Sequence, residues 1–170
     1  HRVHRRQRQM CIRDSAGIKY NSKYKEIIKL AEFCNLPIVT AAGHGDAIPF
    51  NHKLHAGQMG PRGNPVASRL VKEANVILAI GTRLGFNSTF YSYENINKKA
   101  KIVHIELEKK MLGKYFPIKI GIHADAATAT KQIYEQIKKN KIEIDVKNWT
   151  NLYLKERSKY LIDRDNNNLG

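Results

Sequence analysis

The residues with the clearest chemical potential lie where predicted strands end. Gly81, Thr82 and Arg83 follow the apolar run 76–80, and Glu106 lies at the end of the predicted strand 101–107. Glycine lets a ligand approach the backbone, threonine offers a hydroxyl, and arginine offers a planar fork for phosphate or carboxylate. Ligands of open α/β sheets bind outside the carboxyl ends of the strands, so the pattern predicts a nucleotide-type cleft there. An ordinary strand exit with a solvated arginine explains such a short motif equally well.

Other small and acidic residues are placed in the same way. Residues 43–46 (Gly-His-Gly-Asp) and Asp125 also follow predicted strands, and the glycine-rich segment 57–63 precedes a predicted helix. Free amides at a helix N-terminus suit a phosphate. A carboxylate at a strand end, such as Glu106, commonly accepts hydrogen bonds from ribose hydroxyls.

Several signatures of catalysis are missing from the sequence. It has no G-x-G-x-x-G, no phosphate-binding lysine loop, no nucleophile elbow and no metal-ligand spacing among its seven histidines. His104 lies inside a predicted strand, where we expect it to be packed or hydrogen-bonded. We therefore expect no metal site and no self-contained catalytic site.

The elements that must position these residues alternate along the chain. The patterns predict strands over residues 37–41, 76–80, 101–107 and 118–122, and helices over residues 22–35, 65–74 and 126–139. Residues 49–54 are expected to be irregular, 57–63 a loop, 87–99 a loop with a short helix, and 109–115 a turn. Asp145 is expected to cap a final helix with an apolar stripe of Trp149, Leu152, Tyr153 and Leu161. This alternation predicts an α/β fold with a mainly parallel sheet.

Composition bounds the class of protein. The 170 residues carry a net charge of +15, with 42% hydrophobic residues and two cysteines. The first fifteen residues contribute 5 − 1 = +4 of that charge, and the remaining lysines are spread over predicted helix faces. We therefore expect no nucleic-acid partner. We also expect no membrane span, no signal peptide and a cytoplasmic location, with Cys34 a reduced core residue.

The first fifteen residues follow no structural pattern. Residues 3–15 (VHRRQRQMCIRDS) resemble the translation of a sequencing-library adapter, and a native basic arm is the alternative. We expect residues 1–15 to be non-native and residues 1–9 to be disordered or extended. The sheet should then have either a weak strand around Met10 to Ile12 or a gap beside the 76–80 strand.

Five motifs in order resemble the central domain of thiamine diphosphate-dependent enzymes. They are PIVTAAGHGDAIP, HAGQMGPRGNPVAS, EANVILAIGTRLG, KIVHIELEKKMLG and IGIHADA, within about residues 16–137. The GTRLG of the third motif, followed by the fourth motif, looks most like sulfoacetaldehyde acetyltransferase. Acetolactate synthases usually have Asp-Asp-Arg after Gly-x-Arg, where this sequence has residues 85–87 (Gly-Phe-Asn), and the family's Asp-Ile-Asp is Glu-Leu-Glu at 106–108.

The resemblance implies a Rossmann-like three-layer αβα domain at residues 16–140, followed by a linker helix at 141–170 toward a missing C-terminal domain. It implies that the parent enzyme uses thiamine diphosphate and magnesium, at sites not in this chain, to transfer an acetyl unit, and that it assembles as a homodimer or homotetramer. In relatives that hold FAD, the resemblance places the cofactor-lining positions at Gly60, Arg62, Gly63, Gly81, Thr82, Arg83, Glu106 and Asp125. The resemblance thus leaves either a scaffolding role or FAD or ADP binding. A free-standing nucleotide-binding module, similar to electron-transfer flavoproteins or sirtuins, is the competing hypothesis.

Overall fold

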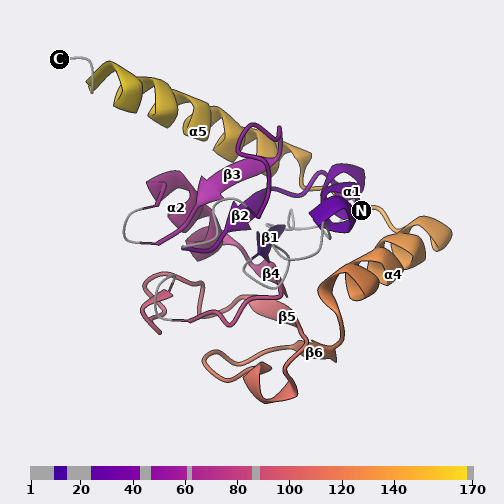
Figure 1. The fold of residues 1–170 in the computed structure, drawn as a ribbon. Coiled ribbons are helices and arrows are strands. Elements are labelled where there is room, and N and C mark those ends of the chain that lie inside the picture. The colour runs from indigo at the N-terminus through magenta and orange to yellow at the C-terminus, as the bar shows by residue number, and fades with distance from the viewer. Residues whose placement is uncertain (1–9, 15–23, 43–46, 61–62, 86–88, 168–170) are drawn as a thin grey trace, which may run out of the picture.

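The computed structural model describes residues 10–14, 24–42, 47–60, 63–85 and 89–167. Figure 1 shows a twisted sheet with helices on both sides. The strands are β1 (Met10–Asp14), β2 (Ile38–Thr40), β3 (His55–Gln58), β4 (Val76–Ile80), β5 (Lys101–Glu106) and β6 (Ile120–His123). The helices are α1 (Tyr24–Cys34), α2 (Pro65–Glu73), α4 (Ala126–Lys139) and α5 (Lys147–Asn167), with a 3₁₀ turn, η1 (Lys109–Met111).

The six strands form one parallel sheet in the order β3-β2-β1-β4-β5-β6. The chain first steps outward from β1 to β3 and then returns to the other side of β1 with β4. The strand order therefore reverses between β1 and β4, the place where such sheets bind ligands. The α/β, Rossmann-like, three-layer fold predicted from the sequence is confirmed.

Strand β1 occupies the centre of the sheet. Its five residues pair in unbroken register with β4, from Met10 beside Val76 to Asp14 beside Ile80, and its last three pair with β2. The gap considered for this position is wrong, and the strand is longer than the weak one expected around Met10 to Ile12. The expectation for residues 1–9 lies outside the described residues, and the adapter origin of residues 1–15 stays a prediction.

Strand β3 (His55–Gln58) was missed by the sequence patterns, which predicted a loop from Gly57 and assigned no element to residues 55–56. The segment His-Ala-Gly-Gln has no β-branched or aromatic residue, so local propensity does not favour a strand. Pairing with β2 makes it one, with a register shift between Ile38 and Val39. A tertiary contact has thus decided the local conformation.

Most other elements agree with the predictions to within one or two residues. In α2 the Asn64 side chain accepts a 2.8 Å hydrogen bond from the Val66 amide, with Pro65 in the first position, as predicted. In the segment 87–99, where a loop and a short helix are expected, Thr89 is helical and residues 90–99 form turns, bends and irregular chain, while residues 87–88 lie outside the described residues.

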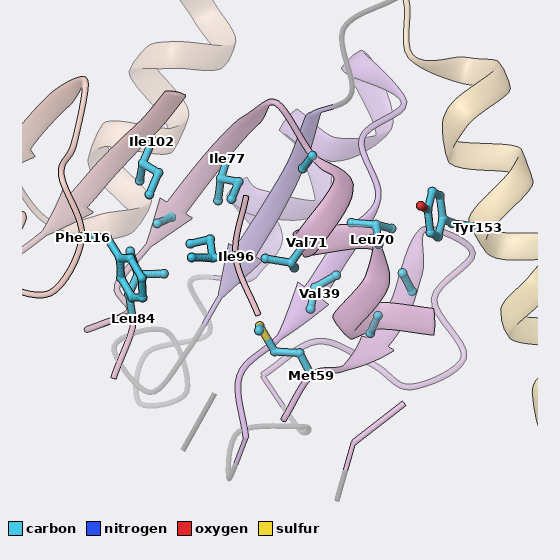
Figure 2. Packing of buried hydrophobic residues seen from close by; sticks show 14 of the residues in the cluster. Val39, Met59, Leu70, Val71, Ile77, Leu84, Ile96, Ile102, Phe116 and Tyr153 are labelled. Carbon is cyan, nitrogen blue, oxygen red and sulfur yellow. The ribbon is translucent and has the colours of Figure 1, made fainter. Parts of the chain in front are cut away.

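Two hydrophobic clusters hold the layers together, one on each face of the sheet. Helices α1 and α4 cover one face, with a core of Ile27, Leu30, Leu78, Ile80, Ile105 and Ala129 among others. Helix α2, the start of α5 and the segments after β4 and η1 cover the opposite face. Figure 2 shows this second cluster, which includes Val39, Met59, Leu70, Val71, Ile77, Leu84, Ile96, Ile102, Phe116 and Tyr153.

Helix α5 has two different halves. Trp149 and Tyr153 lie in the core, and the Thr150 hydroxyl donates a 2.7 Å hydrogen bond to the Asn35 carbonyl. Leu152 is 53% exposed, so its place in the predicted apolar stripe is wrong. The last turns of α5 extend beyond the sheet (Figure 1). None of the helices in the described ranges is both long and apolar enough to cross a membrane.

Candidate functional site

The predicted site residues divide into two groups along the carboxyl edge of the sheet. Gly81, Thr82 and Arg83 follow β4, Glu106 ends β5 and Asp125 follows β6, and these three strands are neighbours. The glycine-rich segment follows β3, with β2 and β1 between it and β4. At about 4.8 Å per strand, the two groups are separated by roughly 14 Å, so only an extended ligand would contact both.

The exit from β4 is held by backbone bonds. Gly81 adopts a φ of +56°, a conformation that favours glycine, and its amide donates a 2.8 Å hydrogen bond to the Ile105 carbonyl. The Thr82 side chain is buried, and its hydroxyl lies 3.4 Å from the Leu84 amide. The Thr82 hydroxyl is therefore part of the loop rather than a group that faces a ligand.

Arg83 is the exposed member of this loop. Its side chain is 70% exposed, and its Nη2 atom lies 3.7 Å from Oε2 of Glu108, beyond hydrogen-bond distance. Lys110 contacts the other oxygen of Glu108 at 2.7 Å. The pKa of Glu108 is lowered from its ordinary value, mainly by the hydrogen bond from Lys110, with a smaller effect from the Arg83 charge. Arg83 is thus presented to solvent beside a carboxylate that an anionic ligand would have to compete with.

The two acidic site residues already accept hydrogen bonds from their own chain. Oε1 of Glu106 accepts from the Leu107 amide at 2.9 Å and from the Glu108 amide at 3.2 Å. Oδ1 of Asp125 accepts from the Thr128 amide at 3.1 Å and thereby caps α4. These contacts give both carboxylates a structural role that needs no ligand. The second oxygen of Glu106 accepts neither of these bonds, and its chemistry suits a ribose hydroxyl.

The glycines after β3 meet a packing requirement. A Cβ atom at Gly63 would lie 2.3 Å from the Gln58 carbonyl oxygen, so only glycine fits there. Gly60 has a φ of +114°, and its amide lies 3.5 Å from the Ser68 hydroxyl. Arg62 lies outside the described residues.

The start of α2 offers few free amides to a phosphate. Pro65 has no amide hydrogen, Asn64 binds the amide of Val66, and the Ser68 amide bonds the Asn64 carbonyl. Among the described residues, no group of three or more histidine, cysteine, aspartate or glutamate side chains could hold a metal ion.

One connection at this edge was not predicted. Nε2 of buried His104 lies 2.8 Å from the Thr82 carbonyl oxygen, and the Gly113 amide lies 3.4 Å from Nδ1. The expectation that His104 is hydrogen-bonded is confirmed, but its partners belong to two different loops. Strand patterning identifies a histidine in a strand, and it carries no signal for contacts 22 residues away.

The parallel sheet and its strand order define a Rossmann-like α/β domain. Residues 6–133 match the family model described as "Thiamine pyrophosphate enzyme, central domain", and the chain belongs to this family. The competing assignment to an electron-transfer flavoprotein-like or sirtuin-like module is therefore not supported.

Curated relatives agree with this assignment. The chain is 33% identical over 128 residues to sulfoacetaldehyde acetyltransferase of Roseovarius nubinhibens, covering 74% of this chain and 21% of that protein. It is 32% identical over 128 residues to a probable sulfoacetaldehyde acetyltransferase of Rhizobium meliloti, covering 74% and 22%. It is 28% identical over 121 residues to a probable acetolactate synthase large subunit of Methanococcus aeolicus, covering 71% and 20%. The chain thus spans about a fifth of the length of these relatives.

The family match brings β1 into the domain, since it begins at residue 6, before Met10. It ends at residue 133, within α4. Nothing in the match tests the limits 1–15, 16–140 and 141–170, which stay predictions. The structure adds that the first half of α5 contributes to the core of the same domain.

Proposed function

We propose that this chain is the central domain of a thiamine diphosphate- and magnesium-dependent carboligase or acetyltransferase, similar to acetolactate synthase or sulfoacetaldehyde acetyltransferase. The observation that carries the proposal is the family match over residues 6–133, together with relatives of these two kinds. As part of such an enzyme the domain would support a homodimer or homotetramer.

Neither the motifs of the sequence nor the residues that the structure describes fit thiamine diphosphate or its magnesium ion. The sequence has no Gly-Asp-Gly segment, and the described residues hold no cluster of metal ligands. Catalysis would therefore need groups supplied from outside this chain. We propose that the 170 residues by themselves have no transferase activity.

The domain's own role is scaffolding, and nucleotide binding is the second candidate. The scaffold role is favoured because the amides of Gly81 and Val66 and the carboxylate of Asp125 are engaged within the domain. The observation that favours a nucleotide, FAD or ADP, is the exposed guanidinium of Arg83 in the loop after β4, with Glu106 at the end of the neighbouring strand β5. These residues fit a phosphate and a ribose hydroxyl, respectively.

Calorimetric titration of the purified chain with ADP and with FAD separates the two roles. The scaffold role predicts no measurable binding of either compound. Saturable binding that Arg83→Ala weakens would instead support the nucleotide role. Lys131→Ala is the matched control, because it removes an exposed cation on α4, away from the loops that follow β4 and β5.

The parent class is tested by the coding sequence on either side of this chain. A continuous reading frame that adds a Gly-Asp-Gly…Asn motif downstream would support a thiamine-dependent enzyme. A frame that continues into an unrelated catalytic domain would contradict it.

A further inference from the structure

His104 is built into the edge of the sheet that carries the site residues. It lies two residues before the end of β5, is 1% exposed, and is in register with Ala79 of β4 and Gly121 of β6. Side chains in register on neighbouring parallel strands share a face of the sheet. The two small neighbours therefore leave room for the imidazole ring on that face.

The ring connects two loops that are far apart in sequence. Nε2 reaches the carbonyl of Thr82, in the loop that carries Arg83, at 2.8 Å. Nδ1 lies 3.4 Å from the amide of Gly113, in the turn that follows η1 and Glu108. These same two loops face each other again on the surface, where Arg83 lies 3.7 Å from Glu108.

The two contacts require one protonation state. A carbonyl needs a donor and an amide needs an acceptor, so Nε2 must carry the proton and Nδ1 must be bare. An apolar residue of similar size would fill the space and leave the Thr82 carbonyl and the Gly113 amide without this partner. A histidine that only filled space in the core would not need a hydrogen bond to either loop.

The turn is shaped to receive this contact. Gly113 adopts a φ of +66°, and a Cβ atom there would lie 3.2 Å from the Ile118 side chain. A Cβ atom at Gly121 would meet the same side chain at 3.0 Å and Leu112 at 3.6 Å. The turn therefore packs closely over β6, beside His104.

We propose that neutral His104 is a positioning residue that ties the Gly81–Arg83 loop to the Glu108–Gly113 turn and thereby sets the spacing of Arg83 and Glu108. The coupling of the two loops stands on the geometry alone. Its consequence, a fixed phosphate-binding position for Arg83, rests on the nucleotide-binding role proposed above.

The tautomer of His104 is the first test. Long-range ¹H–¹⁵N spectra of the ¹⁵N-labelled chain at neutral pH should show one buried neutral histidine protonated at Nε2, assigned by its loss in His104→Leu. A His104 that is protonated at Nδ1 or at both nitrogens would overturn the proposal, because it could not accept from Gly113.

Amide exchange tests the coupling. In His104→Leu, exchange at Gly113 should accelerate by about fivefold more than exchange in β4, as expected for loss of one hydrogen bond. The matched control is Ile105→Ala, which removes a buried apolar side chain from the next position of β5. This substitution should accelerate exchange at Gly113 and at the β4 amides by the same factor. His104→Gln, which keeps a donor and an acceptor on one side chain, should restore protection at Gly113. If His104→Leu accelerates exchange at Gly113 and at the β4 amides equally, His104 only fills space in the core and the proposal is wrong.

ADP affinity tests the consequence separately. If the wild-type chain binds ADP, His104→Leu should weaken binding by about fivefold or more, while His104→Gln and Ile105→Ala should not. Unchanged affinity in His104→Leu would contradict a positioning role toward the ligand. If the wild-type chain binds no ADP, the nucleotide role fails, and the tautomer and exchange measurements still decide whether His104 couples the loops.

Discussion

Acidification should destabilise this domain through a single buried histidine. His55, at the start of β3, is 1% exposed, and Nε2 lies 3.3 Å from the Thr40 hydroxyl. Burial lowers its pKa to about 4, and the positive charge of Arg157 on α5 acts in the same direction. In the unfolded chain the same group titrates at about 6.5.

The sign of the effect follows from proton binding. Below pH 6.5 His55 binds a proton in the unfolded chain, whereas in the folded chain it stays neutral until the pH falls to about 4. Stability is therefore greatest above pH 6.5 and falls as the pH drops from 6.5 toward 4. The two pKa values give a loss of about 2 kcal/mol between pH 7 and pH 5. For a chain of this size that corresponds to a melting temperature about 4–8 °C lower.

Thermal unfolding followed by circular dichroism at pH 7, 6 and 5 measures this loss. His55→Leu should flatten the pH dependence, whatever its effect on stability at pH 7. The matched control is His123→Gln, which removes an exposed histidine on β6 and should keep the slope. A wild-type melting temperature that is equal at pH 7 and pH 5 would refute the reasoning, as would a His55→Leu slope identical to that of the wild type.

Three further outcomes are expected. The purified chain with thiamine diphosphate, magnesium and pyruvate should form no acetolactate, acetoin or acetyl phosphate, and detection of any of them would contradict the assignment of catalysis to groups outside this chain. If ADP or FAD binds, Arg83→Ala should weaken binding by about tenfold, the effect of losing one charge-assisted bond, and calorimetry that finds equal affinities would exclude a phosphate contact by Arg83. Replacing residues 1–15 with an apolar strand sequence should raise the melting temperature by several degrees, because β1 is central and contains an arginine, Arg13; an unchanged melt would contradict the adapter hypothesis.

A fourth outcome concerns α5. Trp149→Ala should cost about 3–5 kcal/mol in denaturant unfolding, because the indole lies in the core, whereas Leu152→Ala, one turn away and exposed, should change stability little. Equal effects of the two substitutions would mean that α5 does not belong to the domain.

The sequence by itself determined the α/β class and the position of most elements. Short segments rich in apolar residues predicted β2, β4, β5 and β6, and Asn64 before Pro65 located the start of α2. These signals are local, because side-chain periodicity and helix caps involve residues within a few positions of one another. The strand ends that carry Arg83 and Glu106 followed from the same runs.

Only the tertiary structure decided the remaining features. Residues 10–14 and 55–58 form full strands because their backbones pair with neighbouring strands. Their own side-chain patterns do not predict strands of this length. The exposure of Leu152 depends on which face of α5 meets α2 and β3. The contact of His104 with Thr82 requires the sheet to bring together residues 22 positions apart. Pairing and packing between distant segments have no period in the sequence, and this is why the strand exits could be read from it while the link between them could not.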